Sequence, residues 1–540
     1  MIIAVFFHYL CAKYSFMGTY LNPDSGNFAR AINAEIYVDK TRMLSVLNDI
    51  IKSGNNYICV SRARRFGKTM ANNMMVAYYG KGCDSREMFS KFKIAKEPSF
   101  EAYLNKFNVI KIDVNSEYQN TRNKDNLVDE LSETIKAEMR QQFPQVNILS
   151  EYTLAKSIQV VYEQTGETFV ILMDEYDVLI RENVSDELFQ SYLGFLNGLF
   201  KSDTLRPAIA LAYLTGIMPI VRDKVQSKLN NFREYTMLWA GPLAEFTGFT
   251  VDEVKSLCDR YGADFNECKQ WYDGYVINGI EIYNPQSVVE SMLRGRFRNY
   301  WNMTSSYEVI SDRISQNFDG TKDAVVRMLS GESVDVNVTT FLNTMQSFRS
   351  INDVFTYLIH LGYLAYDEDN ETCRVPNREV MQEWQNAVSI DSDYSVTNRI
   401  ISQSKLLLKE TFEGNAEAVA LALDESHINV ASNRSYNSED VLQSAIYLAY
   451  IYALNKYTIV REMTAGKGFA DVVYIPVKND VPAMIVELKR NGCVDSALNQ
   501  IRERKYFMSL EHYHGDLLFV AINYDEKTKR HECVIDKFEK

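Results

Sequence analysis

The stretch Tyr57-Ile58-Cys59-Val60-Ser61-Arg62-Ala63-Arg64-Arg65-Phe66-Gly67-Lys68-Thr69 decides the fold of the first half of the chain. Its apolar start predicts a short buried strand, and the Gly-Lys-Thr turn leads into a predicted helix that runs through Tyr79. The end of the stretch matches the phosphate-loop template G-x-x-x-x-G-K-[ST], although Arg62 occupies the first glycine position. A phosphate site is therefore predicted at the start of the helix.

Further apolar runs follow at residues 109–114, 169–173 and 207–214, and helical stretches separate them. This alternation predicts a parallel sheet with helices on both faces. The polar endings of the four strands then meet at one edge of the sheet, where ligands bind in such folds. The predicted fold class is α/β, with a P-loop NTPase sheet, a helical middle region and a further α/β domain at the C-terminus.

Each polar residue at this edge has a predicted role in binding ATP and Mg²⁺. Lys68 reaches the β- and γ-phosphates, while Thr69 and Asp174 hold the metal ion. Glu175 orients the attacking water, and Thr215 senses the γ-phosphate from the adjacent strand. The predicted nucleotide-binding residues are Arg65, Phe66, Gly67, Lys68, Thr69 and Thr215.

Alternative interpretations of these residues stay open at this point. The loop can be a basic strand-to-helix turn followed by a surface Asp-Glu pair, and Thr215 can simply end its strand. Arg62, Arg64 and Arg65 either add positive charge beside the phosphates or are solvated or ion-paired.

A second cluster lies near the C-terminus, in Gly468-Phe469-Ala470-Asp471 and Ile485-Val486-Glu487-Leu488-Lys489. Side chains alternate along a strand, so Glu487 and Lys489 share a face, and a neighbouring strand can bring Asp471 beside them. Two carboxylates and a lysine around a divalent metal can activate water against a phosphodiester. Elements are predicted at 439–454 (helix), 458–463, 469–475 and 483–488 (strands), 494–510 (helix) and 517–523 (strand).

In this cluster, Asp471 and Glu487 are the predicted ligands of Mg²⁺, and Glu439 adds a third carboxylate from an earlier helix. Lys489 polarises the water or stabilises the charge that develops on the phosphate, and Gln500 positions water or phosphate. The predicted catalytic residues are Asp471, Glu487, Lys489 and Gln500, together with Glu175 of the first site. The alternative is a sheet edge with a Glu487–Lys489 salt bridge.

Composition limits the partners and the cellular location. The chain of 540 residues is long enough for two to four domains, and its net charge of −13 disfavours nucleic-acid binding by bulk charge. A local basic face is available in Arg502, Arg504 and Lys505, unless these residues form an ordinary solvated face. Eight cysteines without a CxxC pair predict reduced thiols, hence a cytoplasmic protein. The apolar residues 1–16 are too short to span a bilayer and are expected to be a leader or start-site extension, so no membrane partner is predicted.

Several motifs together resemble one protein family. They are residues 37–41 (YVDKT), 64–69 (RRFGKT), 174–177 (DEYD), 214–217 (LTGI), 229–231 (LNN), 271–275 (WYDGY), 283–285 (YNP) and 376–380 (PNREV). The chain is similar in these motifs to the bacterial AAA-ATPase-like proteins with a C-terminal PD-(D/E)XK nuclease-superfamily domain. The resemblance implies a P-loop ATPase fold, a helical middle and a restriction-endonuclease-like C-terminal domain.

The expected function is ATP binding and hydrolysis coupled to a Mg²⁺-dependent nuclease domain that acts on nucleic acid, with DNA as the expected form. The alternative is a nucleotide-switched protein that binds nucleic acid or a partner without cleavage, and a helical scaffold with vestigial sites is a third interpretation. Duplex DNA, branched DNA and RNA, and assembly into a homo-oligomer, all remain open. The predicted regions are a leader (1–16), an ATPase-like domain (17–240), a helical lid or connector (241–400) and a nuclease-like domain (401–540).

Overall fold

The computed structural model describes residues 18–182, 184–220, 229–301, 307–316, 318–342, 348–390, 395–430, 439–465, 468–476, 481–503, 513 and 515–538. The chain divides into two compact units. The first comprises Met1–Cys268, Tyr272–Arg296 and Val336–Glu371, and the second comprises Lys269–Trp271, Phe297–Asp335 and Thr372–Lys540. Parts of the middle region, 241–400, belong to each unit, and the domain boundaries at 240 and 400 stay predictions.

A five-stranded sheet with the order β2-β3-β4-β1-β5 forms the centre of the first unit. All its strand pairs are parallel, which confirms the predicted α/β fold class. The four apolar runs form strands as predicted, but the short edge strand β5 was not predicted because it has no apolar run. The strands are β1 (Tyr57–Ser61), β2 (Asn108–Asp113), β3 (Phe169–Asp174), β4 (Ile209–Gly216) and β5 (Arg233–Tyr235).

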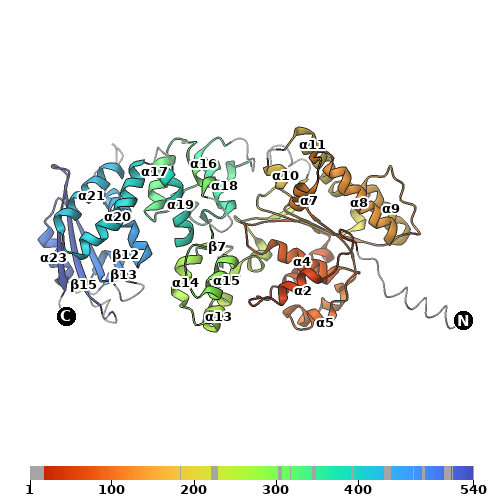
Figure 1. The fold of residues 1–540 in the computed structure, drawn as a ribbon, viewed down its shortest axis with the longest axis horizontal. Coiled ribbons are helices and arrows are strands. Elements are labelled where there is room, and N and C mark those ends of the chain that lie inside the picture. Colours follow the sequence, from red (N-terminus) through yellow and green to blue (C-terminus); the bar gives the residue numbers. More distant parts are fainter. Residues whose placement is uncertain are drawn as a thin grey trace. The chain divides into compact units, whose positions relative to one another are not determined.

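Helices cover both faces of this sheet because its strands are apolar on both sides. Along β3, Ile171 and Met173 join one hydrophobic core, whereas Val170 and Leu172 join the other. Helices α8, α9 and α11 lie on the first side and α2, α4 and α5 on the second (Figure 1). Their bounds are α2 (Gly26–Ile32), α4 (Lys68–Tyr79), α5 (Arg86–Phe89), α8 (Leu127–Gln142), α9 (Leu154–Thr165) and α11 (Asp186–Phe200).

The rest of the first unit consists of short helices and a small antiparallel sheet with the order β6-β8-β7. Thr250 and Glu253 form a capping box at the start of α13, and Thr250 N donates to Glu253 Oε2 at 2.8 Å. The helices are α3 (Met43–Ser53), α6 (Phe100–Tyr103), α7 (Val114–Asn120), α10 (Val178–Arg181), α13 (Val251–Tyr261), α14 (Phe265–Tyr272), α15 (Pro285–Arg294) and α18 (Ile351–Leu361). The strands are β6 (Phe249–Thr250), β7 (Tyr275–Ile277), β8 (Ile280–Tyr283) and β10 (Ala365–Asp367).

The second unit contains another five-stranded sheet, in the order β12-β13-β14-β15-β16. Its pairs are antiparallel except β14 with β15, which run parallel and are joined through helix α23. The edge strand β16 was not predicted, since its residues are mostly polar and half-buried. The strands are β12 (Tyr457–Ala465), β13 (Gly468–Pro476), β14 (Ala483–Arg490), β15 (Leu517–Asp525) and β16 (Arg530–Phe538).

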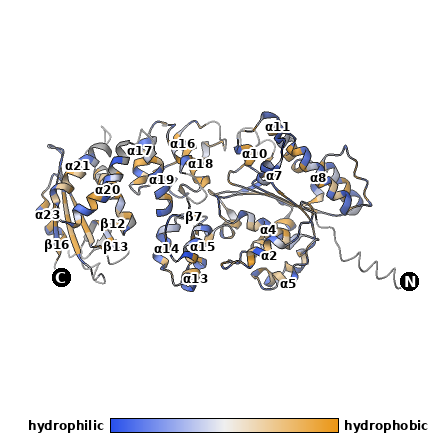
Figure 2. Ribbon diagram, viewed as in Figure 1, coloured by the Kyte–Doolittle hydropathy of each residue, from blue (hydrophilic) through white to orange (hydrophobic). Residues whose placement is uncertain are grey.

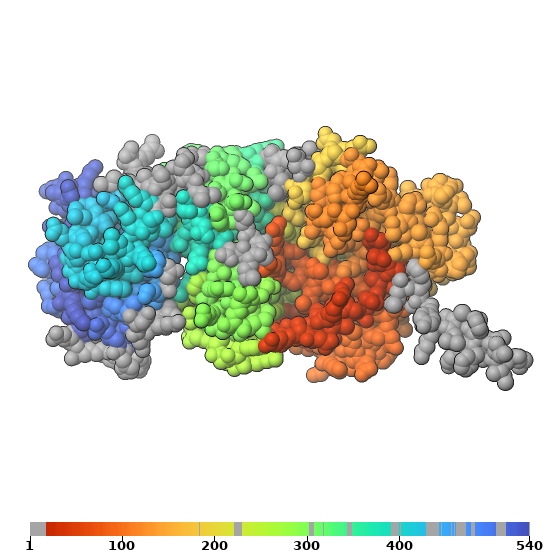
Figure 3. All heavy atoms as spheres, in the orientation of Figure 1, coloured from red at the N-terminus to blue at the C-terminus, as the bar shows by residue number. Residues whose placement is uncertain are grey.

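Two helical layers cover the two faces of this second sheet. Val472 and Val486 pack with α20, α21 and α22 on one face, while Val473 and Ile485 pack with Ile501 of α23 on the other. Figure 2 shows the strands of this sheet mainly in the orange of hydrophobic residues. Figure 3 shows atoms of α20 and α21, coloured cyan, at the surface of the unit. The helices are α16 (Glu308–Ile314), α17 (Thr321–Leu329), α19 (Arg378–Ile390), α20 (Ser395–Phe412), α21 (Ala416–Val430), α22 (Glu439–Ala449) and α23 (Val494–Glu503), beside the strand pair β9 (Val334–Asp335) and β11 (Thr372–Arg374).

Two predicted helices of this unit differ from the structure at their ends. The helix predicted to reach residue 454 ends at Ala449 and continues as the 3₁₀ helix Ile451–Asn455, a tightening that is common at helix ends. The helix predicted for 494–510 is present to Glu503, and residues 504–510 lie outside the described part of the chain. Over the described ranges, no helix has both the length and the apolar character needed to cross a membrane.

Candidate functional site

The predicted phosphate loop connects the end of β1 to the start of α4. Gly67 is the N-cap of α4 with φ 84°, a left-handed conformation that glycine adopts without steric cost. Lys68 is buried at 8% exposure, and its Nζ donates to the carbonyl oxygens of Arg62 at 2.9 Å and Ala63 at 2.8 Å. Burial lowers the pKa of Lys68 to about 8. The loop therefore encloses an ammonium group that it binds through its own carbonyls.

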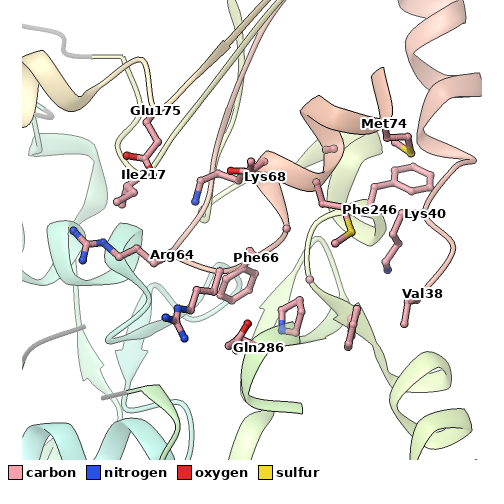
Figure 4. Close-up of a pocket in the computed structure, with 18 of the residues that line it drawn as sticks. Val38, Lys40, Arg64, Phe66, Lys68, Met74, Glu175, Ile217, Phe246 and Gln286 are labelled. Atoms are coloured by element: carbon pink, nitrogen blue, oxygen red, sulfur yellow. The ribbon is translucent and has the colours of Figure 1, made fainter. Parts of the chain in front are cut away.

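A pocket of about 700 Å³ lies directly over this loop. Figure 4 shows Glu175, Ile217 and Arg64 on one side of Lys68, and Val38, Lys40, Met74 and Phe246 on the other. The pocket thus has a charged end and an end with an apolar lining. The charged end is lined by Arg64, Arg65, Phe66, Gly67, Lys68, Thr69, Glu175, Arg181 and Glu182. The other end, called the apolar end, is lined by Lys40, whose ammonium is paired with Glu253, and by the apolar residues Phe28, Ile36, Tyr37, Val38, Met43, Met74, Phe246, Phe249, Pro285 and Val289.

Asp174 and Thr215 lie behind the pocket wall rather than in it. They are 2% and 0% exposed, and Thr215 Oγ1 donates to Asp174 Oδ1 at 2.5 Å. Asn72 Nδ2 of α4 in turn donates to Thr215 Oγ1 at 3.2 Å. The adjacent ends of β3 and β4 are thereby joined to the helix that starts at the loop. The roles of Asp174 as a metal ligand and of Thr215 as a γ-phosphate sensor stay predictions.

Glu175 lines the pocket from the turn after β3. Its φ of 49° is unusual for a residue other than glycine, and its backbone N donates to Asp174 Oδ1 at 3.1 Å. Burial raises the pKa of the Glu175 carboxyl. A carboxylate held at the charged end of a pocket is chemically able to accept a proton from water or to orient it.

The second predicted site is assembled on the face of the second sheet that carries α23. Glu487 is buried at 1% exposure, and its Oε1 accepts hydrogen bonds from Lys489 Nζ at 3.1 Å and from Gln500 Nε2. Lys489 Nζ also donates to Gln500 Oε1 at 2.7 Å. Asp471 Oδ2 accepts from the backbone N of Leu488 at 2.7 Å. Strand β13, strand β14 and helix α23 therefore bring the four predicted catalytic residues of this site together.

The register of the strands explains this grouping. Val472 lies opposite Val486, so Asp471 precedes that pair on β13 just as Glu487 follows it on β14, and their side chains share a face. Two carboxylates supply the oxygen ligands that Mg²⁺ prefers, so the residues present fit that ion by type. Among the residues that the structure describes, no group of three His, Cys, Asp or Glu side chains is arranged to hold a metal ion.

The third predicted carboxylate, Glu439, is the first residue of α22. Leu442 and Ile446 of this helix pack into the core on the face of the sheet opposite α23. The side chain of Glu439 lies outside the described part of the chain, so its metal-binding role stays a prediction.

Family comparisons match the two regions of the chain that carry the candidate sites. Residues 26–226 match the model of a predicted AAA-ATPase, and residues 437–533 match the model of the PD-(D/E)XK nuclease superfamily. The chain joins an AAA-ATPase-like domain to a PD-(D/E)XK nuclease superfamily domain. The resemblance found in the sequence motifs is therefore confirmed.

Individual relatives are distant from this ATPase- and nuclease-like chain. An uncharacterized protein in the vnfD 5′ region of Azotobacter chroococcum mcd 1 is 26% identical over 163 residues, which cover 29% of this chain and 31% of that protein. The chain thus matches about a third of that relative's length. Among solved structures, the ORC2 protein of Aeropyrum pernix (11% identity, 66% of this chain and 97% of that chain, TM-score 0.32) and its ORC1 protein in complex with DNA (10%, 70% and 98%, TM-score 0.27) are similar.

Arg62 of the ATPase-like domain corrects one interpretation of the sequence. It does not line the pocket over the loop but is 0% exposed, with Nε donating to Thr247 Oγ1 at 2.9 Å and Nη1 to Tyr235 O at 2.9 Å. Burial lowers the pKa of its guanidinium to about 10. The side chain turns inward, where carbonyl and hydroxyl oxygens accept hydrogen bonds from Nε and Nη1, whereas Nη2 has no hydrogen-bond partner among the described residues. Arg64 and Arg65, by contrast, line the pocket.

Sequence reasoning missed most of the apolar end and also Arg181. The apolar end is assembled from residues 36–38, 246–249 and 285–289, which are far apart in the sequence. Residues of two family motifs, 37–41 and 283–285, line this end of the pocket. The sequence alone assigned no role to either motif. Asn284 gives the second motif a structural reason, because its Oδ1 caps α15 by accepting from Gln286 N at 2.9 Å and Ser287 N at 3.3 Å.

The basic helix face predicted for the nuclease-like domain is described only in part. Arg502 on α23 forms a salt bridge with Asp536 of β16. Arg504 and Lys505 lie outside the described residues. The charge of Arg502 is therefore partly neutralised within the domain.

Proposed function

We propose that the chain binds and hydrolyses ATP in the pocket over the Gly67-Lys68-Thr69 loop, and that its C-terminal domain cleaves nucleic-acid phosphodiesters with Mg²⁺, DNA being the expected substrate. Nucleotide binding in the first domain would control cleavage in the second. The observation that carries the proposal is one continuous pocket of about 700 Å³ over the phosphate loop, with charged side chains on one side of Lys68 and a mostly apolar lining on the other.

The two ends of this pocket suit the two ends of a nucleotide. Backbone N–H groups at the start of α4, with Lys68, offer donors and positive charge to phosphates. The apolar lining offers a surface against which a purine can pack, and the volume lies in the range of ordinary ligand pockets. On binding, Lys68 would exchange its two carbonyl contacts for phosphate oxygens. Thr69, which lines the pocket, is positioned to contribute its hydroxyl to a metal ion bound with the nucleotide.

The second site supports phosphodiester cleavage by its donor set. Mg²⁺ held by Asp471 and Glu487 would supply a water of lowered pKa as the nucleophile. Lys489 brings a positive charge beside Glu487, where it can stabilise charge that develops on a phosphate. Gln500 holds Lys489 in place through its Oε1. Each of these residues therefore has a task that its position in the structure allows.

Cleavage of a mixed panel of DNA and RNA substrates, with and without Mg²⁺ and ATP, tests the proposal. We expect cleavage by the wild-type protein that Asp471→Ala removes while ATP hydrolysis continues. Glu503→Gln is the matched control, because Glu503 is an exposed carboxylate at the end of the same helix α23. Cleavage by Asp471→Ala at the wild-type rate would show that the site is assigned wrongly.

A nucleotide-switched binding protein without cleavage is the second candidate function. It is favoured by the hydrogen bonds within the site, where Lys489 and Gln500 both donate to Glu487 and Asp471 accepts from a backbone amide. This network gives the carboxylates partners within the chain itself. ATP hydrolysis without cleavage of any substrate in the panel would support this candidate.

A further inference from the structure

Arg181 is a further cation at the charged end of the nucleotide pocket, beside Lys68, Arg64 and Arg65. It ends the short helix α10 after β3, and its side chain lines the pocket together with Lys68 and Glu175. The side chain is 10% exposed, so solvent screens its charge only weakly. Nothing in the sequence pattern assigned a role to this residue.

Asp177 fixes the position of Arg181. Its Oδ2 lies 2.8 Å from Nε of Arg181 and also accepts hydrogen bonds from the backbone N of Ile217 at 3.1 Å and of Met218 at 2.9 Å. A Cβ atom on Gly216 would lie 2.5 Å from Asp177 Oδ1, so the chain is packed tightly against this carboxylate. The ion pair keeps the guanidinium beside this carboxylate and leaves N–H donors of its fork for a ligand.

The charge of Arg181 acts on both functional groups at this end of the pocket. Burial raises the pKa of Glu175, and Arg181 opposes this rise more than any other nearby charge. Burial lowers the pKa of Lys68, and the positive charge of Arg181 adds to that lowering. Arg181 therefore lies within electrostatic range of the groups assigned to the phosphates and to the attacking water.

We propose that Arg181 contacts the terminal phosphate of a bound nucleoside triphosphate, so that the pocket prefers ATP to ADP, and that Asp177 is the residue that positions it. This inference rests on the proposed ATP-binding function. Glu175 and Ile217 lie on the side of Lys68 away from the apolar end, so a nucleotide with its base in the apolar end directs its terminal phosphate toward Glu175 (Figure 4). Arg181 is the cation that acts most strongly on the Glu175 carboxyl, so its guanidinium is within reach of that phosphate. A guanidinium forms its strongest hydrogen bonds with such an anion.

The same contacts connect the terminal phosphate to the end of β4. Asp177 binds Arg181 on one side and the amides of Ile217 and Met218 on the other. A phosphate that competes with Asp177 for the guanidinium changes the balance of charge at these amides. Loss of the terminal phosphate on hydrolysis would restore the arrangement that the structure shows.

Affinities of the full chain for ADP and for a non-hydrolysable ATP analogue, both with Mg²⁺, test the inference. We expect Arg181→Ala to weaken binding of the ATP analogue about 10- to 150-fold, the range for a lost hydrogen bond to a charged group, and to change ADP binding less than about threefold. Asp177→Asn is expected to lower the same ATP-to-ADP ratio by a smaller factor. Arg122→Ala is the matched control, because Arg122 is exposed and lies outside the pocket.

The outcomes separate this inference from the function on which it rests. If the wild type binds ATP but Arg181→Ala weakens the binding of both nucleotides equally, or of neither, the proposed role of Arg181 is overturned. A wild-type protein that binds neither nucleotide would instead overturn the proposed function. If Arg181→Ala does not fold, as its thermal unfolding shows, Arg181→Lys decides: it keeps the charge but loses the planar fork, so a reduced ratio supports the inference and an unchanged ratio contradicts it.

Discussion

The two candidate sites both contain a lysine near carboxylates, but they hold their lysines differently. Lys68 of the ATPase-like domain is bonded to two backbone carbonyls and faces a pocket. Lys489 of the nuclease-like domain is bonded to the side chains of Glu487 and Gln500. Backbone carbonyls are parts of a loop that can rearrange around a phosphate, whereas the Lys489 network lies on a sheet and a packed helix. We therefore expect the first site to accept a ligand and the second to keep its groups in fixed relative positions.

The largest expected effect comes from a substitution in the first site, at Lys68. Lys68→Ala removes the only side-chain ammonium that the loop encloses among the described residues, and with it the charge expected on the β- and γ-phosphates. We expect ATP hydrolysis to fall by about 100-fold or more, as for the loss of other groups that stabilise developing charge. Phosphate release measures it, and Lys52→Ala, an exposed lysine of α3, is the control. Unchanged turnover would mean that this pocket is not the ATPase site.

Lys68→Ala also tests whether the two sites depend on each other. If nucleotide binding controls the nuclease-like domain, cleavage by Lys68→Ala should no longer respond to ATP although Asp471, Glu487 and Lys489 are unchanged. Cleavage that is equally ATP-dependent in this variant would contradict such control.

The next effect concerns the fixed network of the second site. Gln500→Ala removes one hydrogen-bond partner from Lys489 and one from Glu487. We expect cleavage to fall by about 10- to 100-fold, the usual range for residues that orient metal ligands, with ATP hydrolysis unchanged. The ratio of the two activities in one preparation measures it. A parallel loss of both activities would show unfolding instead, and full cleavage would show that the network is dispensable.

Comparing the sites also shows how far sequence reasoning reached. Strand β1, the loop and α4 are contiguous, so the pattern from Tyr57 to Thr69 predicted the strand, the loop and the start of the helix that line this part of the pocket. The pairing of Asp471 with Glu487 was predicted because side chains alternate with a period of two and the register follows from the buried face. Both predictions depend on local geometry.

Features that depend on distant parts of the chain were not predictable. Arg62 follows the same strand as Lys68, yet it points inward because Thr247 and Tyr235, brought close by folding, accept its hydrogen bonds. The apolar end of the pocket combines residues near 37, 246 and 287 for the same reason. Strand β16 was missed because its partner is β15 and its own residues are only partly buried, so no continuous apolar run marks it.

A smaller effect is expected from pH, which should change the ATP affinity of the first site through Lys68. Burial lowers the pKa of Lys68 to about 8 in the ligand-free pocket, and phosphate binding favours the charged form. ATP affinity should therefore be nearly constant below pH 8 and fall by up to about tenfold per pH unit above it, because binding must then take up a proton. Titration calorimetry across pH 7 to 9.5 measures this, and Lys68→Arg, whose guanidinium stays charged, should remove the dependence. A flat wild-type profile would contradict the lowered pKa.

The smallest expected effect belongs to the second unit, where acid stability depends on a buried histidine outside both sites. His531 of β16 is 6% exposed, and its Nδ1 lies 2.8 Å from Oδ1 of Asp424 on α21. Burial lowers its pKa, while Asp424 opposes that shift. Since the unfolded chain takes up the proton near pH 6.5, the stabilisation is present above that pH and is lost as the pH falls toward the folded pKa. The midpoint temperature of thermal unfolding should be lower at pH 5.5 than at pH 7.5, by roughly 2–4 °C for each kcal/mol of unfolding free energy lost. His531→Gln should make this difference in midpoint temperature smaller. An equal difference in the variant would assign the acid sensitivity to other groups.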